Sequence, residues 1–138
     1  MLVVDASVAV LWFVPQEHAE AASAILASKV RLVAPRLLRL ETASPLLRAV
    51  RRGEMPATQA RHILEVLIPA SVTFADEPSD ELDAFEVART QGGSAYDGLY
   101  VALARRLGAA LVTNDRAMHR TAQAVGVEAR FLGGELAP

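Results

Sequence analysis

Two aspartates follow short apolar segments that are typical of buried strands. Asp5 comes directly after Leu2-Val3-Val4, and Asp115 lies just beyond a second apolar segment, residues 109–113. In an open parallel sheet, ligand sites lie beyond the carboxyl ends of the strands. The two carboxylates would therefore converge if these two strands are neighbours in the sheet.

Two further acids, Glu41 and Asp97, are expected within helices. Carboxylates that share one site repel each other, by about 4 kcal/mol for two unit charges about 4 Å apart at an effective dielectric near 20. Hard divalent cations remove that cost, and all-oxygen ligand sets select magnesium or manganese over zinc. The hypothesis is a metal site for Mg²⁺ or Mn²⁺ built by four acids: Asp5, Glu41, Asp97 and Asp115.

Each acid also has a purely structural explanation. Asp97 stands three residues after Ser94, the spacing of a helix capping box. Asn114-Asp115 can cap the helix that follows it, and Asp5-Ala6-Ser7 can begin another. Glu41 can be an ordinary solvated residue. Taken one at a time, none of the four acids is specific for chemistry.

Other chemistries have weaker support in the sequence. The absence of cysteine removes thiolate nucleophiles and thiolate metal sites. No pair among the three histidines, His18, His62 and His119, has a metal-binding spacing. Neither a glycine-rich phosphate loop with its lysine nor a Gly-x-Ser-x-Gly motif is present. An aspartyl-phosphate phosphatase would need a second acid two residues after Asp5, where Ser7 stands.

Composition favours one compact domain over residues 1–138, with 52% apolar residues available for its core. The lack of cysteine fits a reducing cytoplasm, which is the expected location. The apolar segment from Val8 to Val14 is far too short to span a bilayer. The amino-terminal segment lacks the basic region of a signal peptide. We therefore expect no membrane association.

Charge is unevenly distributed along the chain, although its net value is only −2. Residues 29–61 are strongly basic and residues 76–86 are strongly acidic. One region could face phosphates and the other could not. Two solvated helix surfaces of opposite sign explain the same pattern equally well.

Apolar periodicity and turn residues predict five strands and seven helices. Strands are expected over residues 2–4, 31–34, 72–74, 109–113 and 128–131, and helices over 8–13, 16–28, 36–52, 57–67, 79–90, 95–107 and 115–125. Pro45 should bend the helix over 36–52, and Pro69 should end the helix over 57–67. The alternation of strands and helices predicts the α/β class, with a mainly parallel sheet between helices.

Four segments, read together, resemble the PIN domain family in order and interval. They are Val3-Val4-Asp5-Ala6-Ser7, residues 38–43 with Glu41, residues 95–104 with Asp97, and Leu111-Val112-Thr113-Asn114-Asp115. The last two are the most specific, and the resemblance covers nearly the whole chain. In length and content the chain is similar to the toxins of VapBC-type toxin–antitoxin modules.

The resemblance implies a three-layer α/β/α fold around a five-stranded, mainly parallel sheet. It also implies metal-dependent endonuclease activity on RNA, with Mg²⁺ or Mn²⁺ as cofactor. By position, Asp5, Glu41 and Asp97 match the core acids of the family and Asp115 matches the fourth. Supporting roles near the site fall to Ser7, Thr113 and Asn114.

The same resemblance implies a VapB-like antitoxin partner and a homodimer. Apolar residues that could line an antitoxin groove, or simply the core, are Trp12, Phe13, Leu46, Leu47 and Val50. Candidates for contacts with RNA phosphates are Arg36, Arg39, Arg48, Arg51 and Arg52. The alternatives are a PIN nuclease of RNA processing and a non-catalytic, PIN-like RNA-binding domain.

Overall fold

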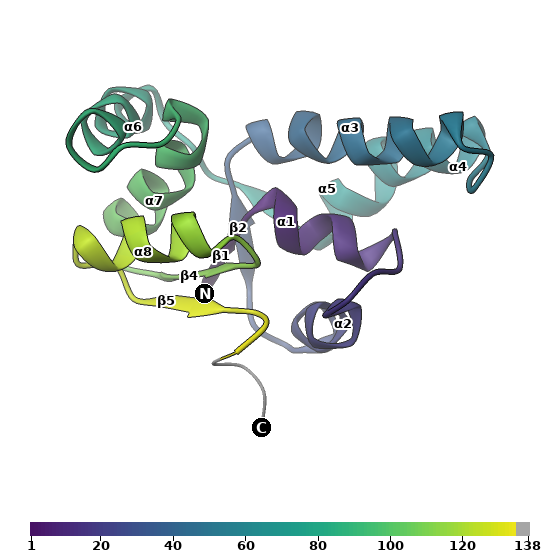
Figure 1. Cartoon of the computed structure of the whole chain (residues 1–138), viewed down its shortest axis with the longest axis horizontal. Coiled ribbons are helices and arrows are strands. Elements are labelled where there is room, and N and C mark those ends of the chain that lie inside the picture. The colour runs from purple at the N-terminus through teal and green to yellow at the C-terminus, as the bar shows by residue number, and fades with distance from the viewer. Residues whose placement is uncertain (135–138) are drawn as a thin grey trace.

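The computed structural model describes residues 1–134, which form a three-layer α/β/α arrangement around a five-stranded, all-parallel sheet (Figure 1). The strands run in the order β3-β2-β1-β4-β5. Their bounds are β1 Leu2–Val4, β2 Leu32–Ala34, β3 Thr73–Phe74, β4 Ala110–Thr113 and β5 Ala129–Phe131. The predicted fold class is confirmed, and each strand lies within a residue or so of its predicted range.

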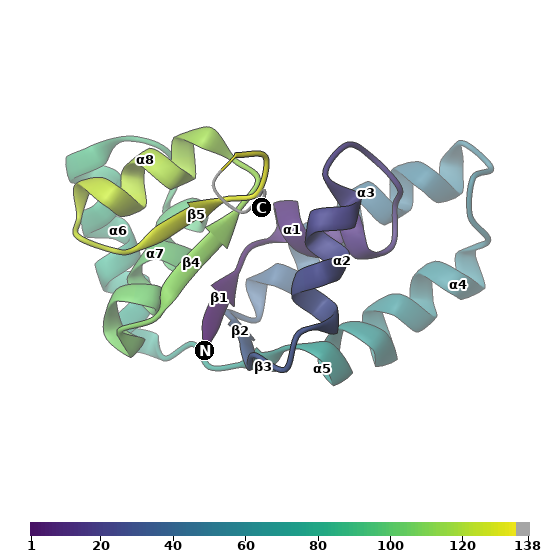
Figure 2. The same ribbon diagram turned by 90° about the horizontal axis from the view of Figure 1, so that it is seen from below.

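Eight α-helices surround the sheet in the described part of the chain. Their bounds are α1 Ala6–Ala9, α2 Ala19–Ala27, α3 Leu37–Arg51, α4 Ala57–His62, α5 Ile68–Ser71, α6 Pro78–Gln91, α7 Ala95–Leu107 and α8 Arg116–Ala124. Helices α6, α7 and α8 gather on one side of β4 and β5, and α2 lies on the other side (Figures 1 and 2). The pair α3 and α4 extends beyond the sheet.

The two central strands, β1 and β4, supply much of the core. Val3, Val4, Leu111 and Val112 are completely buried. Strands that are covered on both faces read as continuous apolar runs, and this explains the two segments seen in the sequence. Because Val4 pairs with Val112, β1 and β4 end side by side.

Helices α6 and α7 make an unusually close contact at Gly98. A Cβ atom added to this glycine would lie 2.5 Å from the carbonyl oxygen of Ala84. Only a residue without a side chain allows the two backbones to approach this closely. Gly98 follows Asp97 directly, so this packing also fixes the position of the first turn of α7.

The helical segment after residue 57 departs from the prediction. It continues beyond residue 67 through a π-helical turn, Ile63–Leu67, into α5. The backbone N–H of Ile68 donates to the Ile63 carbonyl, five residues back. Pro69 directly follows this π-helical turn and the helix continues past it to Ser71, so the prediction that it ends the helix is wrong.

Two other boundaries have local causes. Helix α2 begins only at Ala19 because His18 adopts a left-handed backbone conformation with φ of 70°. Helix α3 continues through Pro45 to Arg51.

Within residues 1–134, none of the helices has the length and apolar character needed to cross a bilayer.

A candidate carboxylate site at the ends of β1 and β4

Asp5 lies where β1 ends and is held by two hydroxyl groups, one from α1 and one from the last residue of β4. Ser7 Oγ donates to one carboxylate oxygen at 2.6 Å, and Thr113 Oγ1 donates to the other at 2.7 Å. The backbone N–H of Val8 also donates to Asp5, at 3.2 Å, which caps α1. Both oxygens of this side chain are therefore oriented by the fold.

The same two hydroxyls also fix the loop that follows β4. The backbone N–H of Asn114 donates to Ser7 Oγ at 2.8 Å, and that of Asp115 donates to Thr113 Oγ1 at 3.0 Å. Ser7 and Thr113 thus join Asp5 to the chain that carries Asp115. Ser7 and Thr113, two of the residues with predicted supporting roles, therefore both lie in direct contact with Asp5.

Asp5 is buried without a counter-charge. Its exposed fraction is 2%, and no basic side chain among residues 1–134 forms an ion pair with it. Burial raises the pKa of Asp5 to about 6; hydrogen bonds from Ser7, Thr113 and Val8 oppose that rise, and the charge of Asp115 adds to it. A carboxylate in this state favours a nearby positive charge.

Glu41 comes from α3 and is oriented by a tyrosine on α7. The hydroxyl of Tyr100, whose side chain is buried, donates to Glu41 Oε1 at 2.6 Å. Partial burial and the charge of Asp97 raise the pKa of Glu41, while the Tyr100 hydrogen bond opposes them. The sequence analysis did not single out Tyr100, although it stands three residues after Asp97 and thus on a neighbouring part of the helix surface.

Asp97 and Asp115 complete the set, and both lie at helix starts. Ser94 caps α7 by accepting from the Asp97 backbone N–H at 3.1 Å, which is one half of the predicted capping box. Asp115 Oδ1 accepts from the backbone N–H groups of Ala117 and Met118 and so caps α8. Burial and the charge of Asp115 raise the pKa of Asp97.

The four acids form one electrostatically coupled group. The couplings link Asp5 with Asp115, Asp115 with Asp97, and Asp97 with Glu41. Residues 1–134 hold no group of three or more acidic or histidine side chains already arranged around a common metal position. The carboxylates therefore interact through charge at a distance. Their all-oxygen donor set fits magnesium or manganese, because a divalent cation would relieve the mutual repulsion.

Asn114 carries a buried oxygen without a partner. Its Oδ1 atom accepts no hydrogen bond within the described part of the chain. Buried acceptors are nearly always satisfied, so this one is free to receive a donor from a bound group. Its place between Thr113 and Asp115 puts it in the loop that also holds the fourth acid.

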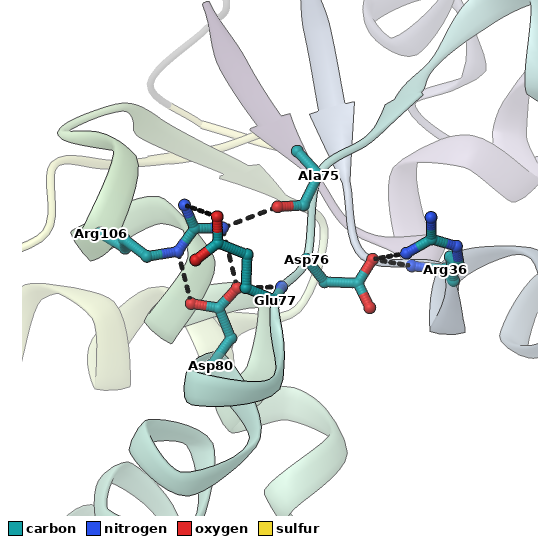
Figure 3. A network of polar contacts seen from close by, with 6 residues as sticks. All are labelled: Arg36, Ala75, Asp76, Glu77, Asp80 and Arg106. Carbon is teal, nitrogen blue, oxygen red and sulfur yellow. Dashed lines mark hydrogen bonds and ion pairs between the residues drawn. The ribbon is translucent and has the colours of Figure 1, made fainter.

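The arginines predicted to contact RNA lie along α3, and only some are near the acids. The backbone N–H of Arg36 and its Nη1 both contact Asp76 Oδ1, at 3.0 and 3.3 Å (Figure 3). The Arg39 guanidinium lies 5.9 Å from the centre of the Phe74 ring. The other three, Arg48, Arg51 and Arg52, stand about 10–16 Å further along the helix axis than Glu41.

A second buried acid, Asp80, lies at the junction of α6 and α7. It accepts hydrogen bonds from Arg106 Nε at 2.7 Å and Nη2 at 2.9 Å, and from the Glu77 backbone N–H at 2.8 Å (Figure 3). Burial acts to raise the pKa of Asp80, but these hydrogen bonds and the charge of Arg106 hold it below the usual range. Arg106 also donates to the Ala75 carbonyl, which fixes the connection between β3 and α6.

The residues considered for an antitoxin groove divide between core and surface. Leu46 is buried, whereas Leu47 is 47% exposed. The other three, Trp12, Phe13 and Val50, are partly buried against the core. Trp12 Nε1 donates to the Ala22 carbonyl at 2.9 Å, which holds its ring beside α2.

Comparison with known proteins identifies the family. The PIN domain model matches residues 2–124. The chain is 35% identical over 117 residues to Ribonuclease VapC3 of Pyrobaculum aerophilum, covering 83% of this chain and 89% of that protein. It is also 35% identical over 124 residues to Ribonuclease VapC9 of Mycobacterium tuberculosis, covering 90% and 93%.

Solved structures show the same fold. The crystal structure of PAE2754 from Pyrobaculum aerophilum superposes with a TM-score of 0.69 at 27% identity, covering 93% of this chain and 87% of that one. The Mycobacterium tuberculosis toxin VapC20, described as cleaving the sarcin-ricin loop, superposes with a TM-score of 0.65 at 20% identity, covering 92% and 96%. The chain is a VapC-like member of the PIN domain family.

Proposed function

We propose that this protein is a divalent-metal-dependent endoribonuclease that hydrolyses RNA phosphodiester bonds. The observation that carries the proposal is the position of Asp5, buried at the carboxyl edge of the sheet, near other acids and without a basic side chain among residues 1–134 to pair with it. A site that binds RNA has no reason to concentrate unpaired carboxylates unless a metal ion joins them. The names of the VapC relatives support the same activity.

The cation, Mg²⁺ or Mn²⁺, would be held by Asp5, Glu41, Asp97 and Asp115. When bound, such an ion lowers the pKa of a coordinated water and polarises the phosphodiester. The surrounding groups keep the carboxylates in place. Ser7 and Thr113 fix both oxygens of Asp5. A carboxylate, Asp97 or Asp115, orients the attacking water by accepting its hydrogen bond.

Replacing Asp5 with asparagine tests this proposal, because the change removes one negative ligand and keeps the shape of the side chain. We expect the purified Asp5→Asn variant to cleave a labelled mixed RNA pool at least about 100-fold more slowly than the parent in Mn²⁺, and EDTA to stop the parent. The matched control is Asp83→Asn, an equal charge change at an exposed position on α6. Equal cleavage by the parent and Asp5→Asn would refute the proposal.

We also propose that the protein is the toxin of a toxin–antitoxin pair. The relatives named VapC and the solved toxin VapC20 support this role. A VapB-like antitoxin would bind the chain and block cleavage. Co-purification with the product of a neighbouring small reading frame, together with loss of RNA cleavage in the complex, is the expected result. Cleavage at the full rate in a stable complex would contradict it.

A homodimer is the proposed assembly. Four large apolar side chains on α3, α6 and α7 are exposed: Leu40, Leu82, Phe85 and Tyr96, with exposed fractions from 59 to 73%. Tyr96 also lines an apolar cavity of about 370 Å³ together with Leu37 and Leu99. Exposed apolar surface of this kind commonly marks a protein interface. Light scattering should give twice the chain mass for the parent and half that value for Phe85→Glu/Tyr96→Glu, whereas a parent of single-chain mass would contradict the dimer.

A further inference from the structure

A cavity with basic walls lies beside α8, which begins immediately after the candidate acid Asp115. Its volume is about 380 Å³, and it lies between α8 and the end of β5, which run alongside each other (Figures 1 and 2). The residues that line it are Arg116, His119, Arg120, Phe131 and Gly134. Nothing in the carboxylate site uses these side chains.

Helix periodicity explains why the basic residues gather there. Arg120 stands four residues after Arg116, and His119 three, so all three side chains lie on the same face of α8. Asp115 caps this helix, so the face begins one residue from the fourth acid of the carboxylate site. A ligand held at the Arg116 end of this face would therefore lie near Asp115, whereas Asp97 lies in a hollow on the opposite face of α8.

Phe131 orders one of these cations. The guanidinium carbon of Arg116 lies 4.6 Å from the centre of the Phe131 ring, and the His119 ring meets the same ring edge-on at 6.1 Å. A stacked guanidinium loses little further rotamer freedom when it binds an anion, because the ring already holds its plane. The Arg116 side chain is thus prepared for binding while it remains exposed.

The two arginines also keep their charge available. Neither Arg116 nor Arg120 forms an ion pair with any acid in residues 1–134, whereas Arg61, Arg89 and Arg106 are each paired. An arginine without an acidic partner can offer its N–H groups to a phosphate in a two-pronged contact. Charge, order and position therefore coincide at this cavity.

We propose that Arg116 and Arg120, with Phe131 as the floor, bind a backbone phosphate of the RNA strand close to the scissile bond. This inference rests on the proposed ribonuclease function and adds a substrate subsite to it. RNA must approach a group of carboxylates that repel it, and a phosphate contact within one helical turn of Asp115 offsets that repulsion. The subsite lies on α8 and is separate from the candidate arginines of α3.

The test compares two charge-matched double variants. Arg116→Gln/Arg120→Gln removes the proposed contacts, and Arg31→Gln/Arg105→Gln removes two exposed arginines beside the amino ends of β2 and β4. Binding of a fluorescein-labelled, single-stranded RNA 12-mer is followed by anisotropy in EDTA over a range of salt concentrations. We expect about tenfold weaker binding, and a salt dependence reduced by about 1.4 in its logarithmic slope, for the first variant only.

Kinetics and a third variant separate positioning from folding. In Mn²⁺, Arg116→Gln/Arg120→Gln should raise KM about tenfold with little change in kcat, because its contacts hold the substrate before and during reaction alike. Phe131→Leu should raise KM by a smaller factor, about threefold, because Arg116 keeps its charge and loses its stack. Circular dichroism measures the folded fraction of each variant. The proposal would be overturned if KM, corrected for that fraction, equalled the KM of the parent.

The outcomes also distinguish this inference from the nuclease proposal. If the parent cleaves RNA and Arg116→Gln/Arg120→Gln binds it as tightly as the parent does, the subsite proposal is overturned and the nuclease proposal stands. Equal weakening in both double variants also overturns the subsite, since it indicates a general effect of charge. Selective loss of RNA binding without any cleavage by the parent supports the subsite and removes the nuclease.

Discussion

Two aspartates of this protein are buried to nearly the same extent and are treated in opposite ways. Asp80, with no exposed surface, receives two hydrogen bonds from Arg106 at the junction of α6 and α7. Asp5, 2% exposed, receives hydrogen bonds from two neutral hydroxyls at the carboxyl edge of the sheet. The pKa of Asp80 is held below its usual range, and that of Asp5 is raised to about 6.

The two aspartates differ in the source of the positive charge that balances them. The chain provides it for Asp80, whose pair with Arg106 joins two helices and the β3 connection (Figure 3). No basic side chain among residues 1–134 pairs with Asp5, and the negative charges of neighbouring acids make its ionised form still less favourable. A buried charge that is paired within the protein is typical of a structural role. A buried charge without an internal partner is typical of a binding or catalytic site.

The largest expected effect on stability comes from removing the partner of Asp80. Arg106→Met leaves that carboxylate buried and uncompensated, which should lower the free energy of unfolding by about 3 kcal/mol in urea denaturation. The matched control is Arg105→Met, the adjacent exposed arginine, which should change it by less than about 0.5 kcal/mol. Equal effects of the two substitutions would show that the pair is not what joins α6 to α7.

Of the two buried aspartates, Asp5 and Asp80, only Asp5 should respond to a divalent cation. At 100 times its dissociation constant, Mn²⁺ should raise the free energy of unfolding of the parent by about 2.7 kcal/mol, because it binds the folded state alone. Asp5→Asn should lose most of this gain, and Asp80→Asn should keep it. Thermal unfolding with and without Mn²⁺ measures both, and a gain retained in Asp5→Asn would place the cation elsewhere.

Without metal, the parent should be less stable than its Asp5→Asn variant at neutral pH. A raised folded pKa means that the fold favours the protonated acid, so stability is lost as the pH rises from about 4 to about 6. A pKa shift of about two units means that ionised Asp5 destabilises the fold by about 3 kcal/mol, a cost that asparagine avoids. The poorer hydrogen bonds of asparagine cost about 1 kcal/mol in return. Urea denaturation in EDTA at pH 8 should therefore show Asp5→Asn about 2 kcal/mol more stable, and the advantage should vanish at pH 4.

The smallest effect concerns acid unfolding. Because the folded pKa of Asp80 is lowered, its contribution is present above the unfolded pKa near 4 and is lost as the pH falls through the folded value. The urea midpoint of the parent should therefore fall more steeply below pH 4 than that of Asp80→Asn. Parallel curves for the two proteins would show that Asp80 does not titrate in this range.

The sequence was sufficient to predict the five strands and most of the helices along the chain. Apolar runs such as residues 2–4 and 109–113 are long enough to be recognised and are buried on both faces. Helix ends that depend on backbone geometry were less accessible. The left-handed conformation of His18 and the π-helical turn before Pro69 arise from packing, and no local residue pattern predicts them.

The four candidate acids and the neighbouring Ser7, Thr113 and Asn114 could be proposed from the sequence, whereas the contacts that helix packing makes could not. Asp5 and Asp115 could be placed together because parallel strands end at one edge. The Tyr100 hydrogen bond to Glu41 joins residues 59 positions apart, and the pairing of Arg106 with Asp80 joins residues 26 apart. Contacts of this kind depend on how helices pack, which periodicity alone does not specify.

The hydroxyl contacts between Ser7, Asp5 and Thr113 have a consequence for protein synthesis. Residues 5 and 113 stand 108 positions apart, so Asp5 has only its local contacts with Ser7 and Val8 until β4 has been made and has paired with β1. Chain segments that lie far apart meet late, after local helices have formed. A nascent or truncated chain that stops before residue 113 therefore lacks both the Thr113 contact and Asp115, and the full set of four carboxylates assembles only when translation is almost complete.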